Sequence, residues 1–352
     1  KVLGTDHPST ATSYNNIGGV YKEKGDYDKA LEYYGKALTI QEKVLGTDHP
    51  STATSYNNIG GVYKEKGDYD KALEYYGKAL TIQEKVLGTD HPSTATSYNN
   101  IGFVYYEKGD YDKALEYYGK ALTIREKVLG TDHPSTATSY NNIGFVYYEK
   151  GDYDKALEYY GKALTIREKV LGTDHPNTAG SYNNIGFVYD EKGDYDKALE
   201  YYGKALVIWE KVLGAGHEDT QDVYFSIAIC SISKGDVEKG KEYLEKWGVK
   251  PYEKSNAFNM AGVTFFKKGK YPESIKLYLV ALDYLAKSEV PKTDVQWPRL
   301  KQNLAKAYCY NGEREKALPL FEEALELSKA LVGEEELKER IKKNYEECKG
   351  RK

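Results

Sequence analysis

Six histidines are the residues of this sequence best suited to metal binding or acid–base catalysis, and each falls at the same position of a repeated unit. They are His7, His49, His91, His133, His175 and His217. A metal site needs further ligands, and a catalytic histidine needs a nucleophile or a proton-transfer partner. The only nearby candidate for a second ligand or a proton-transfer partner is an aspartate, such as Asp48. We therefore predict that these histidines hydrogen-bond within their own turns.

Other short motifs do not indicate catalysis. The Gly-Lys pair at residues 35–36 lacks the glycine that a phosphate-binding loop places five residues earlier. The Asp-Tyr-Asp triplet at residues 26–28 lacks the remaining ligands of a calcium loop, and we expect Asp26 to cap the following helix. Zinc-protease and serine-hydrolase signatures do not occur. We predict no enzyme activity, no catalytic residue, no metal and no cofactor.

Charge and hydropathy argue against nucleic acid and membranes as partners. Charged residues make up 30% of the chain, but the net charge is only -4 and no basic stretch stands out. No apolar run approaches the roughly 18 residues of a membrane-spanning helix. The first residues lack the apolar core of a signal peptide. We expect a cytoplasmic protein.

The three cysteines are far apart in the sequence, at Cys230, Cys309 and Cys348. With no close pair among them, we predict neither a disulfide framework nor a zinc site. We expect unreactive thiols in helix stripes or near the C-terminus, in a reducing compartment.

A unit of 42 residues dominates the chain. The glycine before each Asp-Tyr-Asp marks it, at Gly25, Gly67, Gly109, Gly151 and Gly193. A diverged copy keeps this spacing to residue 235, after which the interval becomes 34 and then 43 residues. We count eight copies, of which five are nearly identical and three are diverged.

Each unit predicts two helices. Pro50 suits the first position of a helix, with Thr47 or Asp48 placed to cap it, and Gly67 suits its end. In the second helix, apolar residues recur with a helical period. Small residues such as Gly60 let the two helix backbones approach closely. Because one helix pair cannot bury both of its apolar stripes, the units must stack on one another.

The order of tyrosine, Ile-Gly, tyrosine, Gly-Asp-Tyr, alanine, tyrosine and Ala-Leu in each copy resembles the tetratricopeptide repeat. The longer unit with Leu-Gly-Thr-Asp-His-Pro is similar to the 42-residue repeats of kinesin light chains. The resemblance covers nearly the whole chain. It implies an all-α fold, namely a right-handed α-solenoid of eight helix-turn-helix units, and we expect a capping helix after the eighth.

Four segments are predicted along the chain. Lys1–Leu3 matches the tail of a second helix, which indicates the remnant of a preceding repeat. Near the other end, Leu337, Ile341, Tyr345 and Cys348 form one apolar stripe among charged residues, as a terminal cap requires. The predicted segments are the remnant 1–12, the five near-identical repeats 13–222, the three diverged repeats 223–333, and the capping helix and tail 334–352.

The resemblance implies that the first helices line a concave groove holding an extended peptide or a partner helix. Repeated asparagines in such grooves resemble ladders that hydrogen-bond the backbone of a bound peptide. The Lys-Asn pair with which one subfamily clamps acidic C-termini is missing. The predicted groove site consists of Asn15, Asn16, Asn57, Asn58, Asn99, Asn100, Phe103, Tyr106, Asn141, Asn142, Phe145, Tyr148, Asn183, Asn184, Phe187 and Asp190.

Differences among the five similar copies concentrate on this groove side. Copies one and two carry Gly and Lys where copies three and four carry Phe and Tyr, and copy five carries Phe187 and Asp190. One interpretation is an aromatic platform in mid-groove, flanked by a basic end. The alternative is drift or a packing adjustment.

Together these features favour a non-enzymatic scaffold that binds a protein or peptide ligand in the groove. The alternative is a structural or engineered consensus array, acting as a spacer or self-stacking module without a dedicated ligand, since near-identity of five copies fits recent duplication or design. Weak self-association through the uncapped N-terminal repeat is a further expectation.

Overall fold

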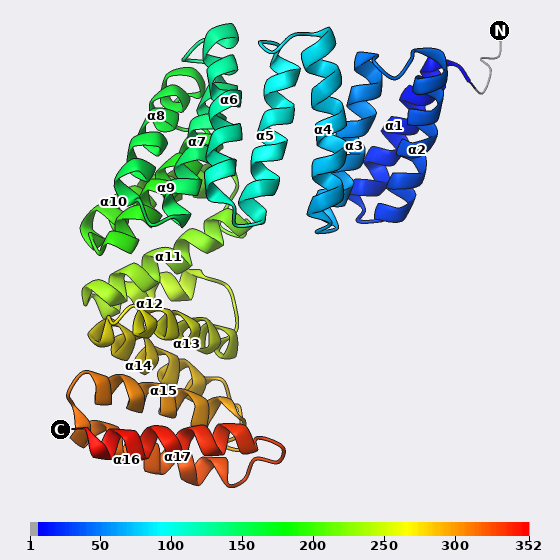
Figure 1. Cartoon of the computed structure of the whole chain (residues 1–352). Coiled ribbons are helices and arrows are strands. Elements are labelled where there is room, and N and C mark those ends of the chain that lie inside the picture. The colour runs from blue at the N-terminus through cyan, green and yellow to red at the C-terminus, as the bar shows by residue number, and fades with distance from the viewer. Residues whose placement is uncertain (1–5, 352) are drawn as a thin grey trace. The chain divides into compact units, whose positions relative to one another are not determined.

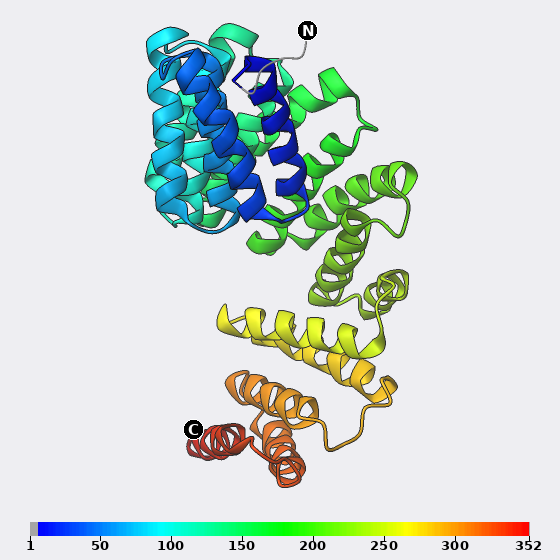
Figure 2. The ribbon, with the colours of Figure 1, turned by 90° about the vertical axis from the view of Figure 1, so that its right-hand side faces the viewer.

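The computed structural model describes residues 6–351 and builds them from paired helices (Figure 1, Figure 2). This part of the chain contains 17 helices and no strand, which confirms the predicted all-α class and the solenoid of helix-turn-helix repeats. The chain divides into two compact units, Lys1–Ser181 and Tyr182–Lys352, which we call unit 1 and unit 2 and describe separately.

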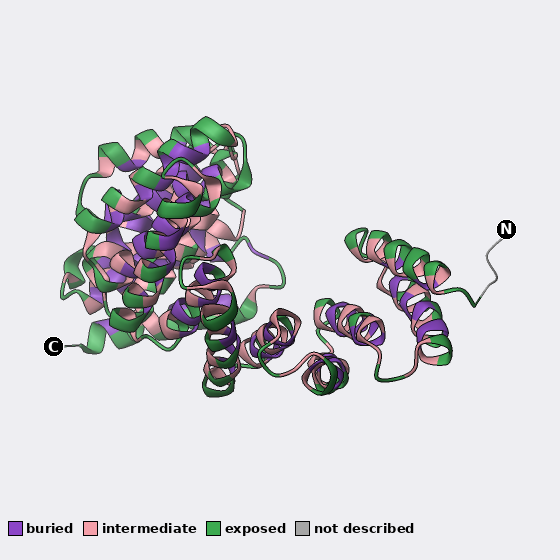
Figure 3. Cartoon of the chain, turned by 90° about the horizontal axis from the view of Figure 1, so that it is seen from above, coloured by how far each residue is buried: buried purple, intermediate pink, exposed green. Residues whose placement is uncertain are grey.

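Unit 1 is a row of four helix pairs followed by the start of α9 (Pro176–Lys192). Each first helix packs on its own second helix, and that second helix packs on the next first helix. Stacking therefore buries both apolar stripes of a pair, and buried residues face inward between the helices (Figure 3). The pairs are α1 (Pro8–Glu23) with α2 (Tyr27–Val44), α3 (Pro50–Glu65) with α4 (Tyr69–Val86), α5 (Pro92–Glu107) with α6 (Tyr111–Leu129), and α7 (Pro134–Glu149) with α8 (Tyr153–Leu171).

A histidine caps the first helix of each similar copy. In α3, the Nδ1 atom of His49 accepts a hydrogen bond of 3.1 Å from the backbone N–H of Ser51. The prediction that the histidines bond their own turns is confirmed, and the same contact recurs at all six. The prediction of Thr47 or Asp48 as the cap is wrong. Histidine Nδ1 is as many bonds from the backbone as an aspartate oxygen, and Asp48 instead pairs with Lys85.

The turn between paired helices follows the prediction. Gly67 has a φ of 75°, the left-handed region that favours glycine, and ends the first helix. The carboxylate of Asp68 then accepts a hydrogen bond of 3.3 Å from the backbone N–H of Lys71, which caps α4. Because each turn needs only these residues, the turn recurs in every similar copy.

A tyrosine ring packs on a glycine between the two helices of each pair. A Cβ atom added to Gly60 would lie 2.9 Å from Cδ1 of Tyr76, and Tyr76 is only 3% exposed. The close approach predicted from Gly60 is therefore real, and the tyrosine ring is what comes close. The same pairing recurs between Gly18 and Tyr34.

Unit 2 contains the end of α9, the second helix of the fifth copy and the diverged repeats. Gly240 of α12 (Val237–Lys246) lies so close to Ile232 that an added Cβ atom would overlap the Ile232 side chain, which explains why glycine stands where alanine is usual. The core of the diverged repeats includes Phe258, Leu277 and Leu300. The helices are α10 (Tyr195–Val212), α11 (Glu218–Lys234), α12 (Val237–Lys246), α13 (Pro251–Lys267), α14 (Tyr271–Lys287), α15 (Gln296–Tyr310), α16 (Arg314–Ser328) and α17 (Glu335–Gly350).

The last helix, α17, packs on α16 and α15, the same two kinds of neighbour that a first helix has inside the array. Leu337, Ile341 and Cys348 are its buried residues. The four segment boundaries drawn from the sequence stay predictions, and Lys1–Leu3 lies outside the described residues.

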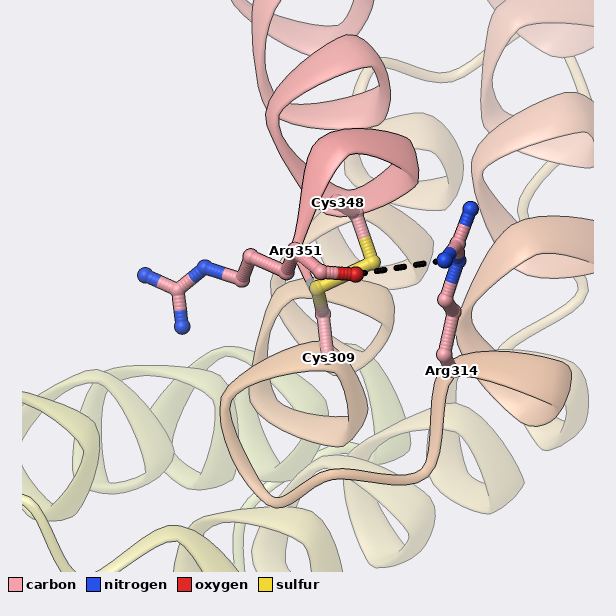
Figure 4. The surroundings of a disulfide bond; sticks show 4 residues. All are labelled: Cys309, Arg314, Cys348 and Arg351. Carbon is pink, nitrogen blue, oxygen red and sulfur yellow. Dashed lines mark hydrogen bonds between the residues drawn. A yellow bond between two sulfur atoms is a disulfide. The ribbon is translucent and has the colours of Figure 1, made fainter.

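Two cysteines form a disulfide, so the expectation of unreactive thiols without a disulfide is wrong for Cys309 and Cys348. Cys309 of α15 and Cys348 of α17 are 39 residues apart in the sequence, but their Cα atoms are 5.9 Å apart (Figure 4). Helices from neighbouring repeats lie side by side, which sequence distance does not reveal. Cys230 is a free, buried thiol, as expected. The reducing compartment was expected because no disulfide was predicted, so the disulfide removes the support for that expectation. No helix within residues 6–351 combines the length and apolar character needed to cross a bilayer.

Candidate functional site

In copies one to three, the first asparagine of the pair links neighbouring first helices. Asn15 Nδ2 donates to Ser55 Oγ over 3.1 Å, and Asn57 makes the same bond to Ser97. Asn99 Oδ1 instead accepts from Asn142 Nδ2 over 3.0 Å. These side chains therefore contribute to the stacking of repeats as well as lining the first-helix face.

The change of partner at Asn99 accompanies a substitution in the second helix of the same copy, α6. In copies one and two, a glutamine such as Gln83 accepts from the serine hydroxyl, here Ser97 Oγ, over 2.6 Å. In copy three, Arg125 replaces the glutamine, and its Nη1 donates to Ser139 Oγ over 2.7 Å. Burial lowers the pKa of the Arg125 guanidinium. In the sequence, glutamine accompanies the Gly-Lys copies and arginine accompanies the Phe-Tyr copies, but the sequence alone does not reveal what this substitution does.

A polar hollow of about 420 Å³ opens among α1, α3 and α5, and we call it the lysine hollow. Lys22 and Lys64 line it together with Asn58 and Asn100, the second asparagines of copies two and three. Gly61 also lines it, and a Cβ atom there would lie 3.4 Å from Lys22 Nζ. The hollow exists because Gly61 stands where the next copy has a phenylalanine.

Four aromatic rings next to this hollow form a continuous series, which we call the aromatic row. Phe103 and Tyr106 of α5 have ring centroids 6.1 Å apart, and Tyr106 is 5.2 Å from Phe145 of α7. Phe145 in turn is 6.4 Å from Tyr148. The structure thus brings the four predicted platform residues together across two repeats.

A cation joins the aromatic row to the lysine hollow. Lys64 Nζ lies 4.8 Å from the centroid of Phe103, a cation–π distance. Phe145 is 40% exposed, so the row presents a ring to solvent. Burial raises the pKa of Tyr106 to about 12, so its hydroxyl remains protonated and can donate at neutral pH.

The predicted groove residues of unit 2 have different surroundings. Phe187 is 39% exposed and packs edge-to-face on Tyr202, with centroids 5.5 Å apart. Within the described part of the chain, the buried Oδ1 atoms of Asp190 and Asn183 have no hydrogen-bond partner. Burial and the neighbouring charge of Glu191 raise the pKa of Asp190 to about 7. Asp190 is therefore a largely desolvated carboxyl group instead of an open charge on the groove.

The remaining predicted residues lie on the same first helices. Asn16 is exposed, and Asn141 and Asn184 are half-buried. Sequence reasoning missed Tyr34 and Tyr76, whose rings line the lysine hollow from the second helices. No group of His, Cys, Asp and Glu within residues 6–351 has the arrangement of a metal site.

Comparison with known protein families identifies the repeats. A sequence model described as tetratricopeptide repeat matches residues 9–85, 51–127, 93–169, 135–206 and 180–246, and a second model of the same description matches residues 300–335. These matches cover more than half of the chain. No curated protein matches it. Tetratricopeptide repeats generally mediate protein–protein interactions and are typically non-catalytic, and the matches include no catalytic domain.

Solved structures show the same architecture. The chain is similar to the nearly identical TPR-like repeats of a protein from Podosopora anserina assigned as a kinesin light chain, with 26% identity, a TM-score of 0.52, and coverage of 59% of this chain and 98% of that one. BtubC from P. vanneervenii is 21% identical, with a TM-score of 0.54 and coverage of 63% and 87%. The apo form of RapI is 20% identical, with a TM-score of 0.59 and coverage of 79% and 98%, and these two show the fold alone. The chain belongs to the tetratricopeptide repeat family.

Proposed function

We propose that the first-helix face of unit 1 binds an extended peptide or a helix of a partner protein. The observation that supports this most is the aromatic row, Phe103, Tyr106, Phe145 and Tyr148, lying beside the lysine hollow. Large rings supply much of the binding energy at protein interfaces, because they bury wide apolar areas at little cost in side-chain entropy.

Copies that lack the aromatic row adopt the same helix pair as the copies that carry it. Copies one and two have the same helices and the same turn geometry as copies three and four, with Gly19 and Lys22 at the corresponding positions. The exposed ring of Phe145 is therefore available for a partner rather than needed for the stacking of repeats.

The neighbouring polar groups fit the backbone of a bound peptide. Asn58 and Asn100 present amide groups in the lysine hollow, where they can donate to peptide carbonyls and accept from peptide N–H groups. Lys22 and Lys64 add donors only. The proposed ligand segment is extended and largely uncharged, with an apolar or aromatic side chain seated on the aromatic row.

A peptide array screened with the full chain tests this proposal. We expect binding peptides to share one apolar or aromatic residue in an otherwise polar, extended segment. Phe145→Ala with Tyr148→Ala should weaken binding of those peptides by about 2 kcal/mol, roughly thirtyfold. An array without reproducible binders, or binders unaffected by the double substitution, would favour a spacer or self-stacking array.

A further inference from the structure

Helix α17 takes the place that a following first helix takes elsewhere in the array. Phe321 of α16 stands at the position of Tyr34 in α2, and α3 packs on Tyr34. Leu337 and Ile341 of α17 belong to the same cluster of buried side chains as Phe321. We call the face of α15 and α16 that α17 covers the cap surface, and its buried residues are Ala305, Ala317, Phe321 and Ala324. The cap surface therefore fits an amphipathic helix with the apolar pattern of α17.

The start of α17 is held less firmly than the start of a first helix in unit 1. His49 caps α3, and Thr52 Oγ1 donates to the carbonyl oxygen of Gly46 in the preceding turn over 2.9 Å. Within the described residues, the side chain of Glu334 makes no capping hydrogen bond to α17, and Val332 close to it is 98% exposed. The segment between α16 and α17 can extend to about 20 Å, so α17 can leave the cap surface while α16 keeps its place.

The disulfide is the strongest tie between α17 and the cap surface. Cys348, in the last turn of α17, is bonded to Cys309 of α15, and both residues are buried (Figure 4). The polar ties of α17 and of the residues beside it involve exposed or half-buried groups, and each is worth little. They join Tyr345 to Glu322, Arg314 to Arg351 and Arg299 to Glu334. Reduction therefore leaves α17 held mainly by one narrow apolar face.

We propose that reduction of this disulfide lets the cap surface accept α17 of a second copy of the chain, and that reoxidation then links the two copies covalently. The exchanged helix makes the same contacts that it makes in its own chain, so exchange costs little beyond association. Leu337 is 3% exposed and Ile341 is fully buried, so the two surfaces already match closely. Each copy gives one helix and receives one, which makes a closed dimer. The proposal is independent of the aromatic row, which lies in unit 1.

The chemistry is thiol–disulfide exchange. A dithiol reductant gives two electrons and two protons to the bond between Cys309 and Cys348, closes to its own disulfide and leaves two cysteine thiols. Reoxidation uses a small disulfide, here oxidised glutathione. The Cys348 thiolate attacks it, forms a mixed disulfide and releases one glutathione thiolate. The Cys309 thiolate of the second copy then attacks the Cys348 sulfur and releases the second glutathione. The two protons that the cysteines lose go to the two released thiolates.

Two crossed variants of the full chain test the exchange. Both carry Cys230→Ser. The helix donor adds Cys309→Ser and keeps Cys348, and the acceptor adds Cys348→Ser and keeps Cys309. Neither variant can close a disulfide within itself, so a bond between the two records a helix docked on the other copy. An affinity tag on the donor lets non-reducing electrophoresis separate the mixed dimer from the two dimers of like chains.

The yield of mixed dimer decides the outcome. With oxidised glutathione and equal amounts of the two variants, the mixed dimer should exceed either like dimer about tenfold or more, because only docking brings Cys309 and Cys348 together. Random collision of exposed thiols would give only about a twofold excess. That smaller excess, or the absence of a mixed dimer, overturns the proposal.

Substitutions in the donor helix show whether docking carries the reaction. Ile341→Asp places a charge against the cap surface and should lower the yield of mixed dimer about tenfold or more. Lys343→Gln changes the net charge by the same amount at an exposed position and should leave the yield within about twofold. A circular dichroism melt checks folding. Equal yields from the unsubstituted donor and the Ile341→Asp donor mean that the bond forms without docking, and overturn the proposal.

The unsubstituted chain gives the second test. After reduction and reoxidation, the share of disulfide-linked dimer should rise with protein concentration between about 5 µM and about 500 µM, and protein that was never reduced should contain no linked dimer. Monomer alone at every concentration after reoxidation would overturn the proposal.

Discussion

At the scale of single residues, the contact of a tyrosine ring with a glycine decides how closely paired helices pack. Glycine inside a helix costs about 0.5–1 kcal/mol relative to alanine, so its recurrence needs a reason. The reason at Gly186 is that a Cβ atom would lie 2.7 Å from Cδ1 of Tyr202, a fully buried ring. Gly203, in the second helix of the same copy, has no such neighbour within 4 Å.

These two glycines should therefore respond oppositely to the same substitution. Gly186→Ala should lower the free energy of unfolding by about 1–3 kcal/mol, because Tyr202 cannot move from its site without disturbing the core. Gly203→Ala should raise it by about 0.5–1 kcal/mol. Urea unfolding followed by tryptophan fluorescence measures both, since all three tryptophans, Trp209, Trp247 and Trp297, lie in unit 2. Stabilisation by both substitutions would contradict the packing described here.

Asp190 is the residue whose burial should make unit 2 sensitive to pH. Its folded-state pKa of about 7 lies above the roughly 3.9 of an unfolded chain. The folded chain therefore retains a proton that the unfolded chain releases, and this contribution to stability is complete below about pH 4 and lost as pH rises through 7. Lys268 and Lys270 oppose the shift without cancelling it.

Asp190→Asn should remove that pH dependence, because the amide cannot ionise. In the unsubstituted chain, unit 2 should lose about 4 kcal/mol of stability between pH 4 and pH 8 from this group, and the variant should be the more stable of the two at pH 8. Tryptophan-detected urea unfolding at several pH values measures the difference between the two proteins. Parallel pH profiles would show that the carboxyl group ionises normally.

At the scale of helices, the disulfide attaches α17 covalently to α15. Leu337 and Ile341 bury one face of the helix, Tyr345 donates its hydroxyl to Glu322 over 2.6 Å, and Cys348 closes a loop onto Cys309. Closing a loop of 39 residues restricts the unfolded chain by about 3–4 kcal/mol. The charged remainder of α17 contributes little packing of its own.

Reduction of this bond should loosen α17 selectively. With dithiothreitol, amide hydrogen exchange should accelerate in residues 335–350 and stay unchanged in residues 50–170. Cys309→Ala with Cys348→Ala should show the fast exchange without reductant and no further response to it. Cys230→Ser is the control and should retain the response, since Cys230 is a free thiol. Unchanged exchange in residues 335–350 on reduction would mean that packing alone holds the helix.

Helices and turns could be predicted from the sequence because they depend on local signals. Pro50, Gly67 and Asp68 occupy the helix positions that their backbone chemistry favours, and five copies repeat that evidence. The disulfide could not be predicted, because residues 39 apart meet only when neighbouring repeats stack. The burial of Asp190 could not be predicted for the same reason, since residues far along the chain, such as Lys270, lie near its carboxyl group.

Part of the candidate site could be predicted from the sequence, because substitutions stand out when the nearly identical copies are compared with one another. The Phe and Tyr substitutions drew attention to Phe103 and Phe145, and the structure places their rings in one series with Tyr106 between them. The hollow lined by Lys267, Lys306 and Arg340 could not be predicted, because these three cations stand at different positions of diverged repeats and the third belongs to α17.

At the scale of the whole array, the near-identical copies of unit 1 should differ in local stability. Gly19 and Gly61 add a second mid-helix glycine to copies one and two, and a Cβ atom there would meet only the ends of flexible side chains or a tyrosine hydroxyl, at 3.4–3.6 Å. Each glycine therefore costs about 0.8–1 kcal/mol without a packing gain. Each repeat of a solenoid contacts only its neighbours, so its stability is set locally. Local unfolding of helices should therefore begin in copies one and two.

Hydrogen exchange measures this gradient directly. Amides of residues 14–24 should exchange faster than those of residues 140–150, and Gly19→Ala with Gly61→Ala should slow exchange in α1 and α3. Slower exchange in residues 14–24 than in residues 140–150 would contradict the argument.

The central claim, that the aromatic row on the first-helix face binds a partner peptide, is tested most directly by exchanging residues between copies of the chain itself. Phe145→Gly with Tyr148→Lys gives copy four the surface of copy one, and Gly61→Phe with Lys64→Tyr gives copy two the surface of copy three. The measurement is the Kd of an array-derived peptide by fluorescence anisotropy, at matched helix content. We predict a loss of about tenfold or more in the first variant and equal or tighter binding in the second. Equal affinity of the first variant and the unsubstituted chain would contradict the claim.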